Sequence, residues 1–322
     1  MKRTIRTVLW NDDERRARTP WRLLASSFVF VVFTLLFGIA AVAVAGAAGI
    51  DPTAFDEFTI LAIGSLLSVP ATAAALWVGA RYVDRRVPSD YGLRIDREWW
   101  VDLGFGLVLG AGLQSGIALV GLLAGWYAVD GVFVADGSIL AGVVLALVLF
   151  VSVGVVEELL ARGWLLTNLA EGLRALGTRA AVGFAVVVSS GIFGVAHLAN
   201  PGASVASAVV ISLAGVLLAL GYVLTGELGI PIGIHVTWNF FQGPVFGLGV
   251  SGLELPVAVV ALDPVGPDWV TGGGFGPEAG LLGFLAVVAG IAATVLWVRR
   301  RKETVDVHES IVEPGLRHAA ED

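Results

Sequence analysis

The chain contains no cysteine, so disulfide bonds, thiolate metal sites and a cysteine nucleophile are all excluded. Charge is also scarce: 15% of the 322 residues are Asp, Glu, Lys or Arg, whereas soluble domains carry about 25%. Lysine occurs only at Lys2 and Lys302, so almost all basic groups are arginines, and the net charge is −7. Hydrophobic residues make up 57% of the chain, and the mean hydropathy is +0.85. These proportions predict an all-α, polytopic membrane protein.

Long apolar runs are abundant. A spanning helix needs about 20 mostly apolar residues. By that criterion the candidate spans are 23–49, 58–82, 101–128, 138–170, 179–198, 204–225, 229–250 and 280–298. The first follows basic residues, as a signal peptide does, but it is too long for a signal-peptide core, so we expect it to be retained. We therefore predict a multi-pass protein of the cell membrane with about eight transmembrane helices.

The charges between these spans alternate in sign. Basic residues gather in the amino-terminal arm, at 83–100, at 171–179 and at 299–302. The loops at 51–57, 130–137 and 251–278 are acidic and contain no Lys or Arg. Because Arg and Lys accumulate on the cytoplasmic side, eight spans with this pattern predict that both termini are cytoplasmic. Since the basic residues are juxtamembrane, nothing in the sequence suggests nucleic-acid binding.

The chain has no internal repeat of fixed period, and its composition divides it into six parts. We predict a basic cytoplasmic amino-terminal arm (1–22), transmembrane helices 1–3 (23–137), a catalytic transmembrane core (138–250), an external Gly/Pro-rich loop (251–279), a last transmembrane helix (280–298) and a cytoplasmic tail (299–322). The charged tail after 303 lacks a helical apolar stripe, so we expect disorder there. His308 and His318 are accordingly interpreted as solvated residues.

The core contains few ionisable groups in its apolar segments: Glu157, Glu158, Arg162, His197 and His235. A charge at the centre of a spanning helix costs roughly 2.5–3.5 kcal/mol on insertion scales, and such residues usually mark function. Glu158 and Arg162 are four residues apart, so they share a helix face and can pair. A purely structural ion pair remains an alternative for these two. Glu157 points about 100° away and has no basic residue at helical spacing, which favours a functional role.

Each of the two core histidines has a notable neighbour one helical turn away. Phe193 precedes His197 in "FGVAH", and Asn239 follows His235 in "HVTWN". An antiparallel helical hairpin places Glu157 and His197 at the same depth in the bilayer. His235 fits less well, because a rise of 1.5 Å per residue leaves a nominal gap of about 17 Å.

A cluster of Glu, His, His and Asn can hydrolyse a peptide bond without a Ser or Cys nucleophile. A carboxylate beside an imidazole can activate water, and an imidazole with a carboxamide can stabilise the oxyanion. The same Glu and His side chains suit a zinc site, in which the metal lowers the pKa of bound water. The residues leave this choice open. They also leave open a proton-coupled membrane transporter and a non-catalytic membrane scaffold or immunity protein.

Three motifs resemble those of the CPBP family of intramembrane proteases. "EELLAR" matches EExxxR, "FGVAH" matches FxxxH and "HVTWN" matches HxxxN, in the family's order and on separate hydrophobic helices. The family includes the type II CAAX prenyl endopeptidases and the Abi group of bacteriocin-processing or self-immunity proteins. The resemblance covers about 145–250, and its flanks are similar to prokaryotic members. Ala161 departs from the pattern, because members often carry an aromatic residue there, and this affects the expected pocket shape rather than the chemistry.

The resemblance implies a role for each motif residue. Glu157 with His197 would activate the attacking water, and His235 with Asn239 would stabilise the oxyanion. Glu158 would assist or orient these groups.

The resemblance further implies that Arg162 and Phe193 support the site, with Arg162 pairing with a carboxylate. In the metal-dependent alternative, Glu157, His197 and His235 are the candidate zinc ligands. The implied architecture is an eight-helix bundle with a cavity open to water. The implied substrates are membrane proteins or lipid-modified peptides in the lipid bilayer, and in a prokaryotic host prenylated CAAX proteins are not expected among them.

Overall fold

The computed structural model describes residues 8–302 and 304–317. Within these residues, seven helical segments are long and apolar enough to cross a membrane. They are α2 (Thr19–Ala47), α3 with its π-helical end (Glu57–Val78 and Gly79–Asp84), α4 (Arg97–Leu123), the continuous segment Ile139–Gly172, α7 (Thr178–Ala196), α8 (Val205–Thr225) and α11 (Leu281–Arg301). The prediction of an all-α, polytopic membrane protein is confirmed.

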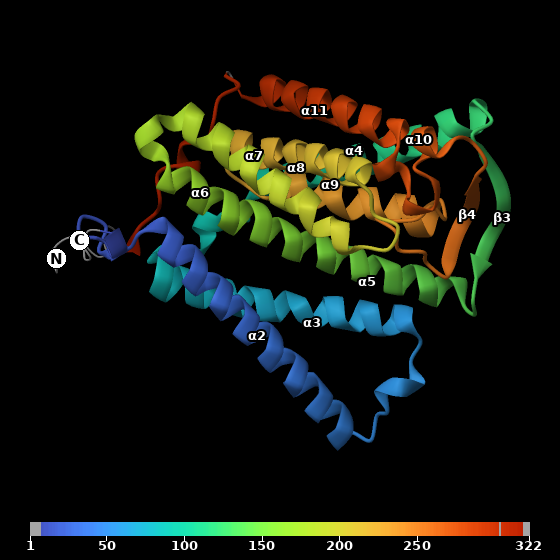
Figure 1. The fold of residues 1–322 in the computed structure, drawn as a ribbon, viewed down its shortest axis with the longest axis horizontal. Coiled ribbons are helices and arrows are strands. Elements are labelled where there is room, and N and C mark those ends of the chain that lie inside the picture. Colours follow the sequence, from blue (N-terminus) through green and yellow to red (C-terminus); the bar gives the residue numbers. More distant parts are fainter. Residues whose placement is uncertain (1–7, 303, 318–322) are drawn as a thin grey trace.

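The seventh predicted span, 229–250, is shorter than expected. Its helix, α9, covers only Gly229–Phe240 and continues as a π-helical turn, Phe241–Val245. Ten of its 12 residues are buried, so α9 is a central helix covered by the others. It still carries the chain from one end of the bundle to the other, and α2 therefore begins at the same end where α11 finishes (Figure 1). Which end faces the cytoplasm stays a prediction.

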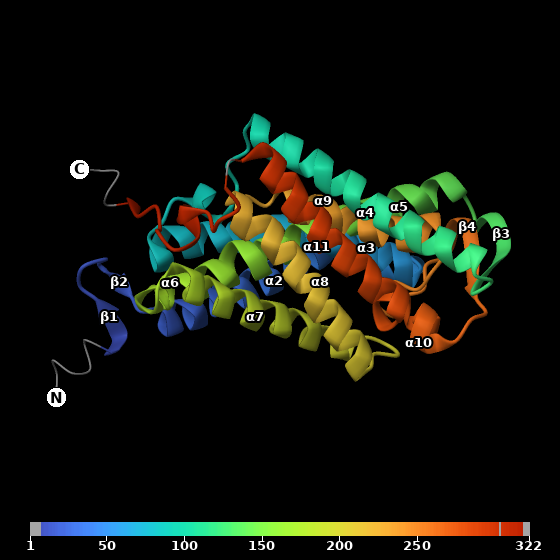
Figure 2. The ribbon, with the colours of Figure 1, turned by 90° about the horizontal axis from the view of Figure 1, so that it is seen from above.

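The two ends of the bundle differ in charge and in structure. We call one the basic end, because it contains the arginine-bearing segments 8–22, 84–97, 171–179 and 299–302. The opposite end, the strand end, contains β3 (Tyr127–Ala135) and β4 (Val257–Pro264), as Figures 1 and 2 show. The remaining loops of the strand end are 48–56, 197–204 and 246–280.

The strand end is more ordered than the sequence analysis predicted. β3 and β4 pair antiparallel from Tyr127 opposite Pro264 to Ala135 opposite Val257, with a bulge between Val129 and Gly131. The Gly/Pro-rich segment that follows forms α10 (Asp268–Thr271) and two 3₁₀ turns, Gly273–Phe275 and Pro277–Ala279. The sequence predicts loops for both regions, because neither strand has a partner nearby in the sequence. The pairing joins segments more than a hundred residues apart.

Glycines allow α9 to reach the centre of the bundle. Where α4 and α9 cross, each presents two glycines four residues apart: Gly106 and Gly110 on α4, and Gly229 and Gly233 on α9. A Cβ atom on Gly233 would lie 2.5 Å from the carbonyl oxygen of Leu103, and one on Gly106 would lie 2.4 Å from that of Ile230. Such spacing of small residues lets membrane helices approach closely. Thr237 of α9 also donates a hydrogen bond to the carbonyl of Leu107, at 2.9 Å.

The basic end contains a buried group of charges, which we call the ion cluster. Its members come from β2 (Arg16–Ala17), α2, the 84–91 segment with its 3₁₀ turn Pro88–Tyr91, and α6 (Thr167–Gly172). Three arginines balance three carboxylates in it: Arg16, Arg22 and Arg86 with Asp84, Asp90 and Glu171. These arginines are at most 2% exposed, so they are structural groups.

Glu171 lies at the centre of the ion cluster. It accepts hydrogen bonds from Arg16 and Arg86 and from Arg22 Nη2, the last at 3.1 Å. Arg86 also donates to Asp90, at 2.8 Å. Although burial acts to lower the pKa of Arg86, Glu171 and the neighbouring acids raise it above its ordinary value.

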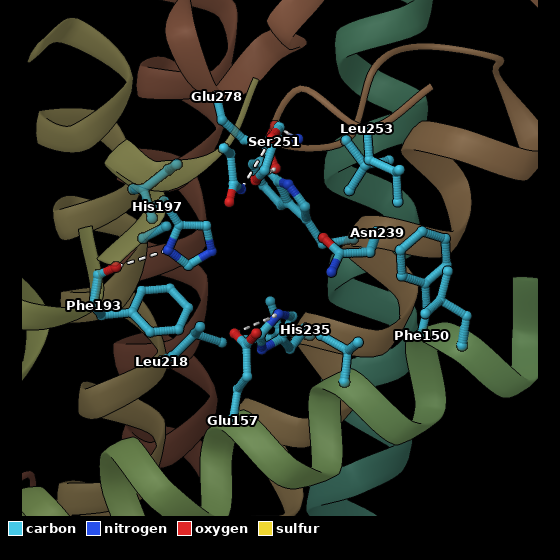
Figure 3. Close-up of a pocket in the computed structure, with 18 of the residues that line it drawn as sticks. Phe150, Glu157, Phe193, His197, Leu218, His235, Asn239, Ser251, Leu253 and Glu278 are labelled. Atoms are coloured by element: carbon cyan, nitrogen blue, oxygen red, sulfur yellow. Dashed lines mark hydrogen bonds and ion pairs between the residues drawn. The ribbon is translucent and has the colours of Figure 1, made fainter. Parts of the chain in front are cut away.

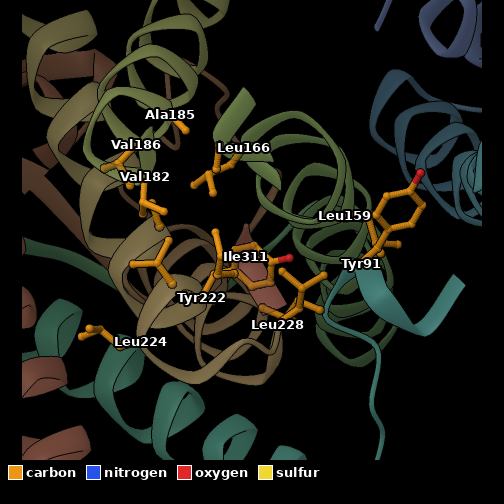
Figure 4. Packing of buried hydrophobic residues seen from close by; sticks show 14 of the residues in the cluster. Tyr91, Leu159, Leu166, Val182, Ala185, Val186, Tyr222, Leu224, Leu228 and Ile311 are labelled. Atoms are coloured by element: carbon orange, nitrogen blue, oxygen red, sulfur yellow. The ribbon is translucent and has the colours of Figure 1, made fainter. Parts of the chain in front are cut away.

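The carboxyl-terminal tail packs onto the basic end, so the prediction of disorder is wrong for residues 304–317. A 3₁₀ turn, Glu309–Ile311, places Ile311 at 1% exposure in an apolar core beside Tyr222 and Leu228 (Figure 4). His308 is half-buried and accepts hydrogen bonds from Ser310, and is therefore not a freely solvated residue. The other tail histidine, His318, lies outside the described residues. A short 14-residue stretch with few apolar residues carries no periodic signal that would have predicted this packing.

Candidate active site

The two glutamates of the "EELLAR" motif are the last residues of α5 (Ile139–Glu158), and a π-helical segment, Leu159–Leu166, follows them. Such segments are frequent at functional sites. Glu158 and Arg162 are both buried, and Arg162 Nη1 donates to Glu158 Oε1 at 2.8 Å. The predicted ion pair is confirmed. Arg162 Nη2 also donates to the carbonyl of Gly215 on α8, at 3.1 Å, which ties the pair to a second helix.

His235 lies on α9 directly against both glutamates. Its Nδ1 is 2.8 Å from Glu158 Oε1, and because a carboxylate accepts, the Nδ1–H donates. Its Nε2 therefore points to Glu157, whose Oε2 is 3.8 Å away. Gly154 of α5 makes room for this approach, since a Cβ there would lie 2.8 Å from a methyl group of Val236. The sequence estimate set His235 about 17 Å in depth from His197, whereas the structure brings His235 against the two glutamates, where α5 and α9 pack closely at Gly154.

His197 follows the end of α7 in a 3₁₀ turn, His197–Ala199. Its Nδ1–H donates to the carbonyl of Phe193 at 2.7 Å, so its Nε2 carries the lone pair when the ring is neutral. The Phe193 ring is 4.7 Å from the His197 ring and 6.0 Å from the His235 ring, centroid to centroid. The guanidinium of Arg162 lies 4.4 Å from the same Phe193 ring. Phe193 therefore connects the two histidines through packing.

These side chains surround one cavity of about 310 Å³. Glu157, Phe193, His197, His235 and Asn239 all line it, and Figure 3 shows Glu157 and His235 on one side of the cavity and His197 on another. No hydrogen bond or ion pair joins Glu157 to His197 in the part of the chain that the structure describes. Of the two acidic motif residues, only Glu157 is open to the cavity, with 35% of its side chain exposed, whereas Glu158 is fully buried. The remaining lining is mostly apolar.

The cavity has a second polar wall, which the sequence analysis missed. Glu278, from the 3₁₀ turn Pro277–Ala279, lines the cavity and is 6% exposed. It accepts hydrogen bonds from Gln242 Nε2 at 2.8 Å and from the backbone N–H of Ser251 at 3.0 Å. Gln242 in turn accepts a hydrogen bond from Gln114 of α4 at 2.7 Å.

The sequence contains a signal for one residue of this second wall but not for the other. Gln114 is a polar residue in an otherwise apolar span, and the cost of burying such groups could have marked it. Glu278 lies in a Gly/Pro-rich segment that reads as a solvated loop, so no local pattern distinguishes it. Burial raises the pKa of its carboxyl, while the hydrogen bonds from Gln242 and Ser251 and the nearby His197 act in the opposite direction.

The candidate zinc ligands do not form a metal site in this arrangement. Among the described residues, no three His, Asp or Glu side chains are close enough together to hold a metal ion. Glu157 and His235 approach each other, but no hydrogen bond or ion pair joins His197 to either of them among the described residues. The chemistry below is therefore derived from the side chains alone.

Comparison with known proteins gives one match. Residues 139–241 match the family model described as type II CAAX prenyl endopeptidase Rce1-like. No curated protein and no solved structure matches the chain. The matched segment begins with α5 and ends just after α9, so it carries all three motifs. The match does not favour the alternative of a transporter or a non-catalytic scaffold; it supports a CPBP/CAAX protease segment over residues 139–241 of this multi-pass membrane protein.

Proposed function

We propose that this protein is an intramembrane endopeptidase that hydrolyses peptide bonds of membrane-associated or lipid-modified proteins with water activated by glutamate. The observation that carries the proposal is the position of His235. Its imidazole is held by Glu158 on one side and reaches Glu157 and the cavity on the other. The match to the type II CAAX prenyl endopeptidase family model supports the same reaction class.

Glu157 is the proposed general base. It is the motif carboxylate that reaches the cavity, and its buried Oε2 has no hydrogen-bond partner among the described atoms. A water in the cavity would give its proton to Glu157 while its oxygen bonds to the scissile carbonyl carbon. The proton then passes to the leaving amine as the C–N bond breaks. His197, with Nδ1–H donated to Phe193, offers its Nε2 lone pair to orient the same water.

His235 and Asn239 are proposed to stabilise the oxyanion. They lie one helical turn apart on α9, and both line the cavity. When protonated, the Nε2–H of His235 is a donor for developing negative charge, and the Asn239 carboxamide supplies a second N–H. Glu158 and Arg162 are positioning residues in this scheme, because they hold His235 without reaching the cavity.

The membrane determines where the proposed reaction takes place. The cavity lies within a bundle of helices that can cross a bilayer, so substrates would be membrane proteins or peptides bound in the membrane. We further propose that the protein resides in the cell membrane with its basic end in the cytoplasm, in accord with the accumulation of arginine at that end.

Cleavage of a membrane-peptide library by detergent-purified protein tests the proposal. Wild type is expected to cleave, and Glu157→Gln is expected to lower kcat by about 10²- to 10⁴-fold, the usual contribution of a general base. His197→Ala should also lower kcat. Glu57→Gln, an identical change at an exposed carboxylate at the start of α3, is the matched control and should cleave as wild type does.

The proposal fails if folded wild type cleaves nothing in the library, or if Glu157→Gln retains wild-type kcat. Adding a chelator or zinc to each reaction separates glutamate-activated water from metal assistance. Under the proposal, neither addition changes the rate.

A further inference from the structure

The second wall of the cavity contains a carboxylate that the proposed hydrolysis does not use. Glu278 is 6% exposed and forms no ion pair with a basic side chain among the described residues. The other deeply buried glutamates differ in this respect: Glu158 pairs with Arg162, and Glu171 contacts three arginines. A buried carboxylate is costly unless it is paired.

The orientation of Glu278 is fixed by its neighbours. Gln242 Nε2 and the Ser251 backbone N–H both donate to Oε2, while the one donor to Oε1 within the described part of the chain is the Ser251 hydroxyl, at 3.2 Å. Because a carboxylate oxygen can accept more than one hydrogen bond, Oε1 has capacity for another donor. Figure 3 shows Glu278 at the wall of the cavity opposite Glu157.

Among the described residues, no Lys or Arg lines this cavity, and its basic groups are the imidazoles of His197 and His235. Its two lining carboxylates are Glu157 and Glu278. Pro201 also lines a neighbouring hollow of about 560 Å³ at the strand end, which Glu254 and Asp268 help to line.

The whole strand end has the same charge character. Its loops contain two Asp in 48–56, two in 124–138 and four Asp or Glu in 246–280, with no Lys or Arg in any of them or in 197–204. A surface of one sign attracts and orients a ligand of the opposite sign. A cationic segment is therefore favoured at this end of the molecule and at the cavity wall next to it.

We propose that Glu278 is a specificity-determining residue that binds a lysine or arginine side chain of the substrate, close to the scissile bond and on the side that faces the strand end. This inference rests on the proposed function, because it assigns the same cavity to a peptide. The substrate's cation takes the place of the arginine partner that the other buried glutamates have. Gln242 and Ser251 hold the carboxylate in position to receive it.

The test compares peptides that differ at one position. A peptide cleaved by wild type is synthesised with lysine or with acetyl-lysine at each position around the scissile bond, and kcat/KM is measured for each pair. At one position lysine should be preferred by about 10- to 100-fold, the range for one charged hydrogen bond. Glu278→Gln should abolish that preference, and Glu278→Asp should retain part of it.

Glu254→Gln is the matched control, since it removes the same charge from an exposed residue of the strand end outside the cavity. It should retain the preference. The inference is overturned if wild type has no lysine preference, if Glu278→Gln keeps it, or if Glu254→Gln loses it equally, which would assign the effect to the general charge of this end.

A binding measurement separates this inference from the protease proposal. Glu157→Gln protein is mixed with the lysine peptides and a carbodiimide, which joins a carboxyl and an amine as an amide with loss of water, and mass spectrometry locates the link. Coupling at Glu278 with lysine peptides, and none with acetyl-lysine peptides, supports the binding site even if no peptide is ever cleaved. Absence of coupling at Glu278 overturns the inference. This measurement keeps Glu278 unchanged, so it applies even if the Glu278 variants fail to fold.

Discussion

Glu171 at the basic end contacts three buried arginines, whereas Glu157 in the cavity has, among the described residues, only His235 within ion-pair distance, at 3.8 Å. Both carboxylates belong to the long helical segment Ile139–Gly172, so the same chain segment supplies the centre of each group. The ion cluster contains equal numbers of arginines and acids. The cavity instead leaves Glu157 Oε2 without a hydrogen-bond partner among the described atoms.

This difference indicates which buried carboxylates have a structural role and which have a chemical one. A carboxylate that accepts hydrogen bonds from three arginines is held in place, which suits a structural role. A carboxylate with an incomplete set of partners can take up a proton, as a general base must. Glu158 combines features of both, because it pairs with Arg162 and also orients His235.

The largest expected effect comes from neutralising each central carboxylate. Glu171→Gln leaves three buried arginines with too few negative charges, and it should lower the free energy of unfolding by about 3–5 kcal/mol. Glu157→Gln should change that free energy by no more than about 0.5 kcal/mol. Unfolding of both variants in mixed micelles measures this. Equal losses in the two variants would remove the distinction between the cluster and the cavity.

A second prediction concerns helix packing, on which the position of His235 depends. Gly233→Ala places a Cβ 2.5 Å from the Leu103 carbonyl oxygen, so α9 must shift. We expect about a 10- to 100-fold loss of kcat/KM, since a displacement of about 1 Å can have that effect, and a destabilisation of about 1–3 kcal/mol. Peptide cleavage and unfolding assays measure the two effects.

Gly104→Ala is the control for this prediction. Gly104 lies on α4 with nothing within 4 Å of the position of its Cβ, so cleavage and stability should remain at the wild-type level or improve slightly. A Gly233→Ala variant that behaves like Gly104→Ala would show that His235 is positioned by ion pairing rather than by close helix approach.

The smallest effect is expected at Glu227, a carboxylate of the basic end outside the ion cluster. Burial, with help from Asp96 and Asp102, raises the pKa of Glu227 to about 7. Because the folded-state pKa is above the ordinary value of 4.5, the folded state is favoured most below pH 4.5, and this contribution is lost as the pH rises to about 7 and beyond.

Glu227→Gln should therefore stabilise the protein at pH 8 by about 1 kcal/mol, after allowance for solvent screening of a half-exposed group, and should have no stabilising effect at pH 4. Thermal unfolding at the two pH values measures this. A pH-independent difference between the variant and wild type would contradict the assigned pKa.

The amino-acid sequence by itself determined the features that depend on local spacing. Helix positions followed from apolar runs, and the pairing of Glu158 with Arg162 followed from their four-residue separation. The same periodicity indicated that Glu157 lies on a different helix face from Glu158. These features are predictable because the geometry of one helix is regular and its period is known.

Only the tertiary structure decided which distant segments meet. It placed His235 against the glutamates through the glycine contacts of α4 and α9, buried Arg16, Arg22 and Arg86 around Glu171, and brought Glu278 from a Gly/Pro-rich segment to the cavity wall. The physical reason is that such contacts depend on side-chain volume and close approach between helices. Neither leaves a periodic signal along the chain.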